Sequence, residues 1–371
     1  MTACDACLRR AWLLGRLSGH LDLARAQGRR LREVLALAPE ALLDALGGAD
    51  RTSIDAALRA AGLPGQLRAA VAGRGLAVVC AHDDGYPARL RDLDDRPAAL
   101  FVLAAGGPDV LGRLVGGDLD DGPAAAAVVG TRRASAEGLE IARGLGRGLS
   151  AAGVAVVSGM ALGIDSAAHE GALAAGGRTV AVLACSADAA YPRRKASLHA
   201  AIARAGAVVS ELPPGAEPRR WAFPARNRII AALAGITVVV EAAERSGSLI
   251  TAELAGDAGR EVGAVPGPVL SWRSAGTNAL LRDGATLIRD TSDVLDAVLG
   301  VELRTAVPAP PGAGVPDHLA PLLRAVGSGA DTVDALATTP VEAERVVRGL
   351  AELEVLGALR REGPRWIVAA R

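Results

Sequence analysis

Two glycine-bearing turns, each placed between an apolar run and a predicted helix, have the composition of a phosphate-binding site. The first reads Gly130-Thr131-Arg132-Arg133-Ala134-Ser135, and the second reads Ser158-Gly159-Met160-Ala161-Leu162-Gly163-Ile164-Asp165. Glycine allows close approach of the backbone, the start of a helix presents unpaired N–H groups, and the guanidinium of Arg132 matches a phosphate. A tight turn explains each glycine alone, but the two loops together favour an anion site. The predicted contacts are Gly130, Thr131, Arg132, Ser135, Ser158, Gly159 and Gly163.

Further basic residues stand beside aromatic side chains in two segments. One is Tyr191-Pro192-Arg193-Arg194-Lys195, and the other, residues 219–228, reads RRWAFPARNR. Cations beside rings suit a single-stranded nucleic acid, because the cations follow the phosphates and the rings stack on bases. A solvated charged loop and aromatic side chains packed in the core are the alternatives, and Phe223 fits the core equally well. The predicted contacts are Arg193, Arg194, Lys195, Arg226, Asn227 and Arg228.

Two helix starts bear on the same site. Arg226 and Arg228 are expected to begin a helix, where the helix dipole disfavours cations unless an anion is bound nearby. A third serine-glycine turn, Ser246-Gly247-Ser248, opens the next predicted helix. It either closes the phosphate site or caps that helix through Ser246 or Ser248, and the residues favour neither reading.

Several other chemistries are excluded or disfavoured. Lysine occurs once, at Lys195, outside any Gly-Lys-Ser/Thr motif, which excludes a standard Walker A loop. The Gly-x-Gly-x-x-Gly fingerprint is absent at residues 130–135, and Ser158 stands where an NAD enzyme carries an acidic residue. Asp165 and His169 share a helical face, but no nucleophile accompanies them, so a helix cap and a surface histidine are favoured. We expect no catalytic residue and no cofactor.

The four cysteines, Cys4, Cys7, Cys80 and Cys185, are too few and too scattered for a disulfide framework and agree with a reducing compartment. Cys4, Cys7 and Cys80 would supply four zinc ligands together with His82, but the usual second Cys-x-x-Cys pair is missing. Reduced, partly buried thiols are therefore favoured, and no metal is predicted.

Six apolar runs between about residues 124 and 290 alternate with predicted helices. The runs are 124–130, 154–159, 179–184, 207–211, 237–241 and 261–267. Continuous runs without period-two polarity are typical of strands covered on both faces, so the sequence predicts an α/β fold with a Rossmann-like, doubly wound parallel sheet. Ligands of such sheets sit beyond the carboxyl ends of the strands, where the glycine, serine and arginine residues lie. The helices are expected at about 136–151 and near 197–205, 226–234, 248–258 and 277–283.

A length of 371 residues predicts more than one domain. Residues 1–70 are expected to form a small helical domain, in which Gly62-Leu63-Pro64-Gly65 fits an interhelical loop better than a helix-hairpin-helix turn. Residues 71–300 form the predicted core domain, and residues 301–316 form a Pro/Gly linker. Residues 317–371 have the order of a winged helix-turn-helix, with seven arginines against eight acidic residues, which weakens a duplex-reading role. Its elements are expected near 318–326, 332–337, 341–356, 358–361 and 366–369.

The net charge of the chain is zero, with 41 basic and 41 acidic side chains, so any basic surface must be local. No apolar run approaches the roughly 18 uncharged residues of a membrane span, and the N-terminus lacks the apolar stretch and cleavage site of a secretory signal. We expect a soluble cytoplasmic protein without a membrane partner.

The motifs follow one another in a fixed order along the chain. They are Gly130-Thr131-Arg132 with Ser135, Ser158-Gly159-x-Ala161-x-Gly163-Ile164-Asp165 with Ala168-His169, Tyr191-Pro192, Ser210-Glu211, Phe223-Pro224-x-Arg226-Asn227-Arg228, Ser246-Gly247-Ser248 with Thr251, and Pro266-Gly267, preceded by Tyr86-Pro87-x-x-Leu90. This series is similar to the DNA-processing protein A family, also called Smf. Ala184-Cys185-Ser186-Ala187 departs from the glycines usual in the family, and Lys195 replaces an asparagine. The choice among Arg193, Arg194 and Lys195 therefore stays open.

The resemblance implies a bacterial cytoplasmic protein that binds and shields single-stranded DNA and loads the RecA recombinase during natural transformation and recombination. It also implies a homodimer formed through the central domain and no catalytic turnover. The DNA contacts that it implies are Arg132, Ser158, Gly159, Arg193, Arg226 and Arg228.

Two other functions are weighed against this one. The first is a nucleotide-binding hydrolase of the lysine-decarboxylase-like phosphoribohydrolase type. Such enzymes carry Pro-Gly-Gly-x-Gly-Thr with a catalytic glutamate, whereas this chain has only Pro266-Gly267-Pro268. The second is a transcriptional regulator that uses the winged helix, which the acidic balance of residues 317–371 disfavours.

Overall fold

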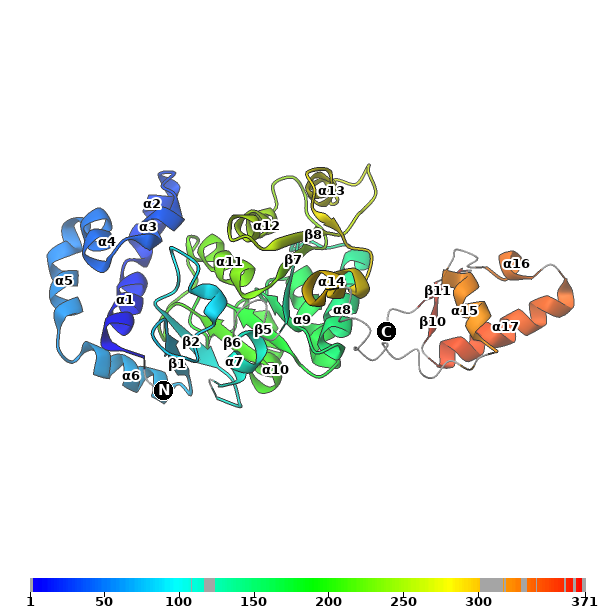
Figure 1. Cartoon of the computed structure of the whole chain (residues 1–371), viewed down its shortest axis with the longest axis horizontal. Coiled ribbons are helices and arrows are strands. Elements are labelled where there is room, and N and C mark those ends of the chain that lie inside the picture. Colours follow the sequence, from blue (N-terminus) through cyan, green and yellow to red (C-terminus); the bar gives the residue numbers. More distant parts are fainter. Residues whose placement is uncertain are drawn as a thin grey trace. The chain divides into compact units, whose positions relative to one another are not determined.

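The computed structural model forms two compact units, Met1–Thr305 and Ala306–Arg371 (Figure 1). The predicted linker, residues 301–316, lies outside the described residues except for Pro316. The described residues are 3–107, 109–116, 124–300, 316, 318–327, 332–337, 339–356, 358–362 and 365–368.

A nine-stranded sheet with the order β1-β2-β6-β5-β4-β3-β7-β8-β9 runs through the first unit. The strands from β6 to β9 in this order pair in parallel, whereas β2 pairs antiparallel with both β1 and β6. Each of the six predicted runs overlaps a strand, so the parallel part of the sheet is confirmed; the antiparallel β1–β2 pair and the short β9 were not predicted. The strands are β1 Ala77–Cys80, β2 Ala99–Leu103, β3 Ala125–Val129, β4 Ala155–Ser158, β5 Thr179–Val182, β6 Ala207–Ser210, β7 Ile236–Val239, β8 Glu261–Ala264 and β9 Thr286–Leu287.

Burial on both faces explains why the central strands are mostly apolar. Every residue of β3 to β7 is buried, and neighbouring residues of one strand face different cores, as Val156 and Val157 of β4 do. One core includes residues of α7, α11 and α12, and another includes residues of α8, α9 and α14. The helices of the core domain are α7 Asp109–Val115, α8 Ala136–Ala151, α9 Ile164–Ala174, α10 Ala196–Ala205, α11 Ala222–Leu233, α12 Gly247–Asp257, α13 Ala275–Arg282 and α14 Thr291–Leu299.

The N-terminal helices predicted for residues 1–70 pack on the sheet. Leu8 and Leu42 share one hydrophobic cluster with Ile202 of α10 and with Trp221. The Trp221 backbone N–H donates to the Asp22 carboxylate of α2 at 2.8 Å, which joins this helix to the segment before α11. Trp221 is thus a core residue, one of the alternatives left open for the aromatics. The helices are α1 Asp5–Arg16, α2 Ser18–Ala26, α3 Leu31–Ala36, α4 Pro39–Leu46, α5 Arg51–Arg59 and α6 Leu63–Gly73.

Helices α8 and α9 approach to backbone contact. A Cβ added at Gly146 would lie 2.1 Å from the Ala168 carbonyl oxygen, and one at Gly171 would lie 2.1 Å from the Arg143 carbonyl oxygen. Only glycine fits at both positions. The contact holds together the two helices that follow the predicted phosphate loops.

Helix α11 begins at Ala222, one turn before the predicted start, because Pro224 is tolerated in a first helical turn. Arg226 and Arg228 therefore lie inside the helix, past its first turn, and the dipole argument for an anion beside them was wrong.

Arg228 is buried in an ion-pair network instead of facing a ligand. Its Nη1 and Nη2 donate to the Glu211 carboxylate at 2.8 and 2.7 Å, and its Nε lies 3.2 Å from a carboxylate oxygen of Asp95. Burial alone lowers the pKa of Arg228, but the charges of Glu211 and Asp95 more than offset this and raise it. The assignment of Arg228 as a phosphate contact is corrected to a structural role, because this network satisfies it.

The second unit contains three helices and an antiparallel hairpin, in the predicted order. It has its own small core, which includes Leu319, Leu350 and Trp366. Within the described parts of both units, no helix is long and apolar enough to cross a bilayer. The elements are α15 Ala320–Gly327, α16 Val333–Leu336, α17 Pro340–Val355, β10 Leu359–Glu362 and β11 Arg365–Val368.

Replacing Arg228 should destabilise the fold strongly. The substitution Arg228→Met leaves Glu211 and Asp95 buried without their cation, and we expect a loss of about 3–5 kcal/mol in the free energy of unfolding. Urea denaturation measures it. Arg282→Met, which breaks an exposed pair with Asp283, is the control and should change stability by no more than about 0.5 kcal/mol. Equal losses in the two variants would refute the structural role.

Candidate functional site

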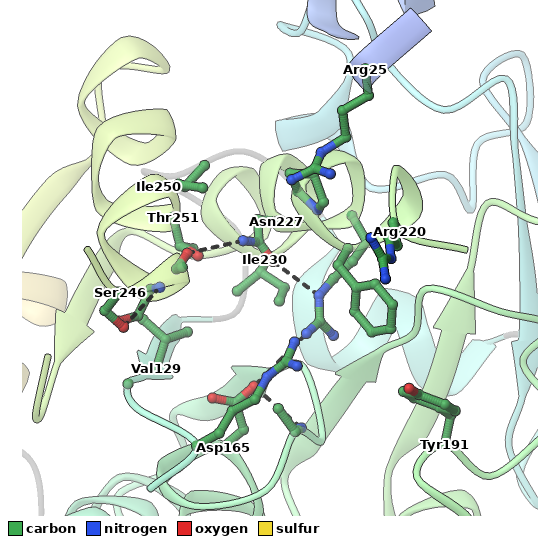
Figure 2. Close-up of a pocket in the computed structure, with 18 residues that line it drawn as sticks. Arg25, Val129, Asp165, Tyr191, Arg220, Asn227, Ile230, Ser246, Ile250 and Thr251 are labelled. Carbon is green, nitrogen blue, oxygen red and sulfur yellow. Dashed lines mark hydrogen bonds and ion pairs between the residues drawn. The ribbon is translucent and has the colours of Figure 1, made fainter. Parts of the chain in front are cut away.

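A pocket of about 620 Å³ lies beyond the end of β3, and its walls include residues of α11 and α12 (Figure 2). Its place agrees with the rule that ligands of parallel sheets sit beyond the carboxyl ends of the strands. Of the sixteen candidate residues, counting the three of the serine-glycine turn, seven line it: Gly130, Arg132, Arg226, Asn227, Ser246, Gly247 and Ser248.

Arg226 forms an inner wall of the pocket. Its buried guanidinium donates to the carbonyl of Gly159 at 2.7 Å and to the carbonyl of Val182, at the ends of the neighbouring strands β4 and β5. Nη2 lies 4.0 Å from the Asp165 carboxylate, and Nε donates to Asn227. Burial lowers the pKa of Arg226, and the Asp165 carboxylate opposes that shift. Arg226 therefore satisfies the strand ends while still bordering the pocket.

Arg132 and two aromatic rings form an accessible cluster at the pocket. The Arg132 guanidinium lies 5.4 Å from the centroid of the Phe223 ring, and the Phe223 and Tyr191 centroids are 5.5 Å apart. Arg132 is exposed, Tyr191 is 41% exposed, and Phe223 is half-buried. Phe223 thus contacts both the core and the pocket, which were the two readings that the sequence left open.

The pocket carries an excess of positive charge. Arg25, Arg132 and Arg220 line it, and none has a carboxylate partner among the described residues. Asp165, the one carboxylate among the described lining residues, is within 4.0 Å of Arg226. Figure 2 shows Arg25 reaching toward the pocket from the N-terminal helices. Three unpaired guanidinium groups around one concave surface favour an anionic ligand.

The start of α12 both lines the pocket and is capped by its own serine. The Ser246 hydroxyl accepts from the Ser248 backbone N–H at 3.4 Å and lies 2.7 Å from the Ser248 hydroxyl. Asn227 of α11 donates to the Gly247 carbonyl at 3.4 Å, which connects the middle of α11 to the start of α12. The capping role is seen directly, and the three residues of this turn also border the pocket.

The remaining polar residues of the two glycine loops form hydrogen bonds that stabilise the loops and the helix that follows the first loop. Ser158 is fully buried and donates to the Val128 carbonyl at 2.7 Å. Ser135 caps α8, accepting from the Gly138 N–H at 2.9 Å, and its own N–H donates to Glu241. The Thr131 carbonyl accepts from the Ile164 N–H, which ties the first loop to the second. Thr131, Ser135, Ser158, Gly159 and Gly163 do not line the pocket.

The basic turn before α10 also lies outside the pocket lining. Arg193 and Arg194 are exposed, whereas Lys195 donates to Glu170 at 2.9 Å. Tyr191, just before this turn, does line the pocket. Arg193 and Arg194 are therefore freer to meet a ligand that extends beyond the pocket.

Asp165 and His169 stabilise the fold and show no catalytic arrangement. Asp165 accepts from the backbone N–H groups of Gly159 and Ala161, at 3.1 and 3.4 Å. His169 is fully buried, with Nδ1 2.6 Å from the Thr179 hydroxyl, so the prediction of a surface histidine was wrong. Burial lowers the pKa of His169 to about 3, so the ring is neutral at pH 7. A buried neutral histidine on a hydroxyl partner is a packing element of α9.

The segment Pro266-Gly267-Pro268, which was compared with the catalytic motif of a hydrolase, is held in place by hydrogen bonds to α13. Asn278 of α13 accepts from the Gly267 N–H at 3.2 Å and donates to the Gly267 carbonyl at 3.0 Å. The Glu241 carboxylate at the end of β7 accepts from the Ser135 N–H at 2.8 Å. Among the described residues that line the pocket, no carboxylate is paired with a nucleophile, so the hydrolase alternative is not favoured.

Sequence reasoning missed Arg25 and did not select Arg220 or Ile250. Arg220 lies in the predicted basic segment of residues 219–228, so its composition marked it. Arg25 lies on α2, and only the packing of that helix against the segment of Trp221 brings it to the pocket. No local pattern in the sequence could identify that contact.

Comparison with known sequences identifies relatives that cover most of the chain. The family model described as DNA recombination-mediator protein A matches residues 77–299. The putative DNA processing protein DprA of Mycobacterium tuberculosis is 42% identical over 288 residues, which cover 76% of this chain and 71% of the relative. The DNA processing protein DprA of Streptococcus pneumoniae is 42% identical over 213 residues, 57% of this chain and 71% of the relative.

Solved structures agree with the sequence matches. DNA processing protein A of Streptococcus pneumoniae aligns with a TM-score of 0.59 and 31% identity, over 80% of this chain and 98% of that one. DNA processing protein A of Helicobacter pylori, described for its single-stranded DNA binding mode, aligns with a TM-score of 0.52 and 29% identity, over 60% and 95% of the two chains. By sequence and by fold, the chain belongs to the DNA recombination-mediator protein A family.

Proposed function

We propose that this protein binds single-stranded DNA at the pocket beyond β3. The observation that carries the proposal is the group of unpaired arginines, Arg25, Arg132 and Arg220, around the accessible Tyr191 and Phe223 rings. Guanidinium groups bind successive phosphates, and rings accept bases whose faces are free only in a single strand.

The spread of these groups favours a polymer over a free nucleotide. Arg25, Arg132 and Arg220 come from three separate segments of the chain, and Arg193 and Arg194 add charge outside the pocket. A chain of phosphates can contact several of these positions at once. The Helicobacter pylori relative, described for its single-stranded DNA binding mode, supports the same ligand class.

The finer parts of the proposal rest on the family resemblance. We propose that the protein acts in the cytoplasm without catalytic turnover, shields single strands, loads the RecA recombinase during transformation and recombination, and works as a homodimer formed through the central domain. We also propose that the three helices and hairpin of residues 317–371 are a winged helix, with a role other than reading duplex DNA. Membership of the DNA recombination-mediator family supports this assignment of roles.

A competition assay tests the main claim. Labelled single-stranded DNA bound to the full chain should be displaced by unlabelled single strands at far lower concentration than by duplex of the same sequence. Equal competition by duplex would refute the proposal. Incubation with nucleoside monophosphates tests the hydrolase alternative, and release of free base at turnover rates would favour that alternative.

Reversing the charge at Arg132 should weaken binding to all sequences alike. Arg132→Glu removes a phosphate contact. The plot of log affinity against log salt concentration has a negative slope, and the magnitude of that slope should decrease by at least about 0.7. Fluorescence anisotropy at several salt concentrations measures the slope. Arg133→Glu is the matched control, because it makes the same charge change at the neighbouring exposed residue outside the pocket lining. The proposed phosphate contact of Arg132 is refuted if the two variants show equal losses of affinity and equal decreases in salt dependence.

Removing the Tyr191 ring should lower affinity without changing the salt slope. We expect Tyr191→Ala to cost about 1–3 kcal/mol of binding free energy, the range for one stacked base. Trp272→Ala removes an exposed ring outside the pocket lining and serves as the control. Anisotropy titrations that find the two variants equal to the unmodified chain would argue against stacking.

The second unit should contribute little to this binding. A chain without residues 304–371 keeps the first unit almost whole and every pocket residue. We expect its affinity for single-stranded DNA to stay close to that of the full chain in the same titration. A collapse of affinity would mean that the site is shared with the second unit.

A further inference from the structure

Three cysteines and one histidine from distant parts of the first unit converge away from the pocket. Cys4 is the N-cap of α1 and Cys7 lies in its first turn, whereas Cys80 is the last residue of β1 and His82 follows it. Their four ligand atoms all lie within 4.8 Å of one another. Spacing along the chain argued against a metal because a second Cys-x-x-Cys pair is missing. The fold supplies the second half of the cluster from 75 residues further along.

The three nitrogen–sulfur distances within the cluster are close to those of a tetrahedral zinc site. His82 Nδ1 lies 3.5 Å from Cys4 Sγ, 3.4 Å from Cys7 Sγ and 4.0 Å from Cys80 Sγ. With Zn–S of about 2.3 Å and Zn–N of about 2.0 Å, sulfur and nitrogen ligands in a tetrahedron are roughly 3.6 Å apart. Three sulfur atoms therefore surround one ring nitrogen at separations close to those that a shared zinc ion requires, and all four ligand atoms lie within 4.8 Å of one another.

We propose that Cys4, Cys7, Cys80 and His82 bind one Zn²⁺ ion. On binding, the three thiols release their protons to solvent, and His82 coordinates through Nδ1 as a neutral ring. Four protein ligands complete the tetrahedron and leave no position for water or substrate, so the site is structural. None of the four residues lines the arginine pocket, which places the metal outside the proposed DNA site.

The surroundings favour such an ion at this place. Three thiolates and one Zn²⁺ together carry one negative charge, which suits the positive end of the twelve-residue helix α1. Asp83 accepts from the Cys80 N–H at 2.7 Å and so shapes the turn that carries His82. Arg68 of α6 donates to the Ala3 carbonyl at 2.8 Å and fixes the chain just before Cys4. Backbone and side-chain contacts thus position the ligands from both halves.

The ion would fasten the N-terminal helices to the edge strand of the sheet. It links the start of α1 directly to the end of β1, two elements that also share one hydrophobic cluster through Leu8 and Val78. Zinc affinity then contributes to the stability of the first unit, because the unfolded chain does not bring the ligands together.

Metal analysis of the full chain tests the proposal. Protein purified in reductant, loaded with Zn²⁺ and freed of excess metal by gel filtration should hold about one zinc per chain, and a chelator should lower its Tm. Co²⁺ in place of Zn²⁺ should give the visible absorption of a tetrahedral thiolate site. Protein that holds no zinc after loading, or that carries a Cys4–Cys7 disulfide when purified without oxidant, would overturn the proposal.

Single substitutions locate the site. His82→Ala changes an exposed side chain, so the fold should persist by circular dichroism, while zinc affinity falls by at least the roughly 10- to 100-fold that loss of an outer-shell partner costs. His82→Cys should keep the metal, since a thiolate replaces the imidazole. Cys185→Ala, which changes the remaining cysteine, and His20→Ala are the controls and should keep full zinc content. Unchanged zinc affinity in His82→Ala would overturn the proposed ligand set.

Discussion

The pocket depends on one buried cation, the guanidinium of Arg226. The Arg226 guanidinium donates to the carbonyls of Gly159 and Val182, which lie at the carboxyl ends of β4 and β5. Buried carbonyls without donors are costly, so this contact permits two strands to end at the wall of a cavity. Asp165 lies within 4.0 Å of the same guanidinium and accepts from two backbone N–H groups of the loop after β4. The second glycine loop takes its shape from this pair.

The arginines of the site divide into two classes with different partners. Arg226 and Arg228 lie two residues apart on α11, yet both are buried and satisfied by protein groups. Arg25, Arg132 and Arg220 have no such carboxylate partner in the described part of the chain. A chain with zero net charge thus obtains a positive surface locally, by pairing some arginines inside and leaving others at the pocket.

The central strands were predictable because their physical constraint is local. A strand buried on both faces must be largely apolar, and five of the six runs, all except that of β8, form strands in which every residue is buried. The β1–β2 pair was missed because an isolated short apolar run does not say whether it forms a strand. The start of α11 was predicted near residue 226, one turn too late, and the first turn that was missed contains Pro224, which such a turn tolerates.

Individual side-chain roles were harder to predict than the strands. Arg132 and Arg228 have the same chemistry in the sequence, and only burial and the position of Glu211 separate a free guanidinium from a paired one. Arg25 and the Cys4 cluster depend on contacts between residues far apart along the chain. The motif order located the pocket, but the packing of side chains decided which residues face it.

The glycine contact between α8 and α9 has a consequence for the thermodynamics of binding. Gly146 and Gly171 bring the two helices to backbone contact, and each helix follows one of the two glycine loops. The loops are also joined directly by the hydrogen bond from Ile164 to Thr131. Such loops are fixed before a ligand arrives, so little conformational entropy is lost on binding. For the proposed ligand, rigidity built within two helices thereby favours affinity without adding a single contact to it.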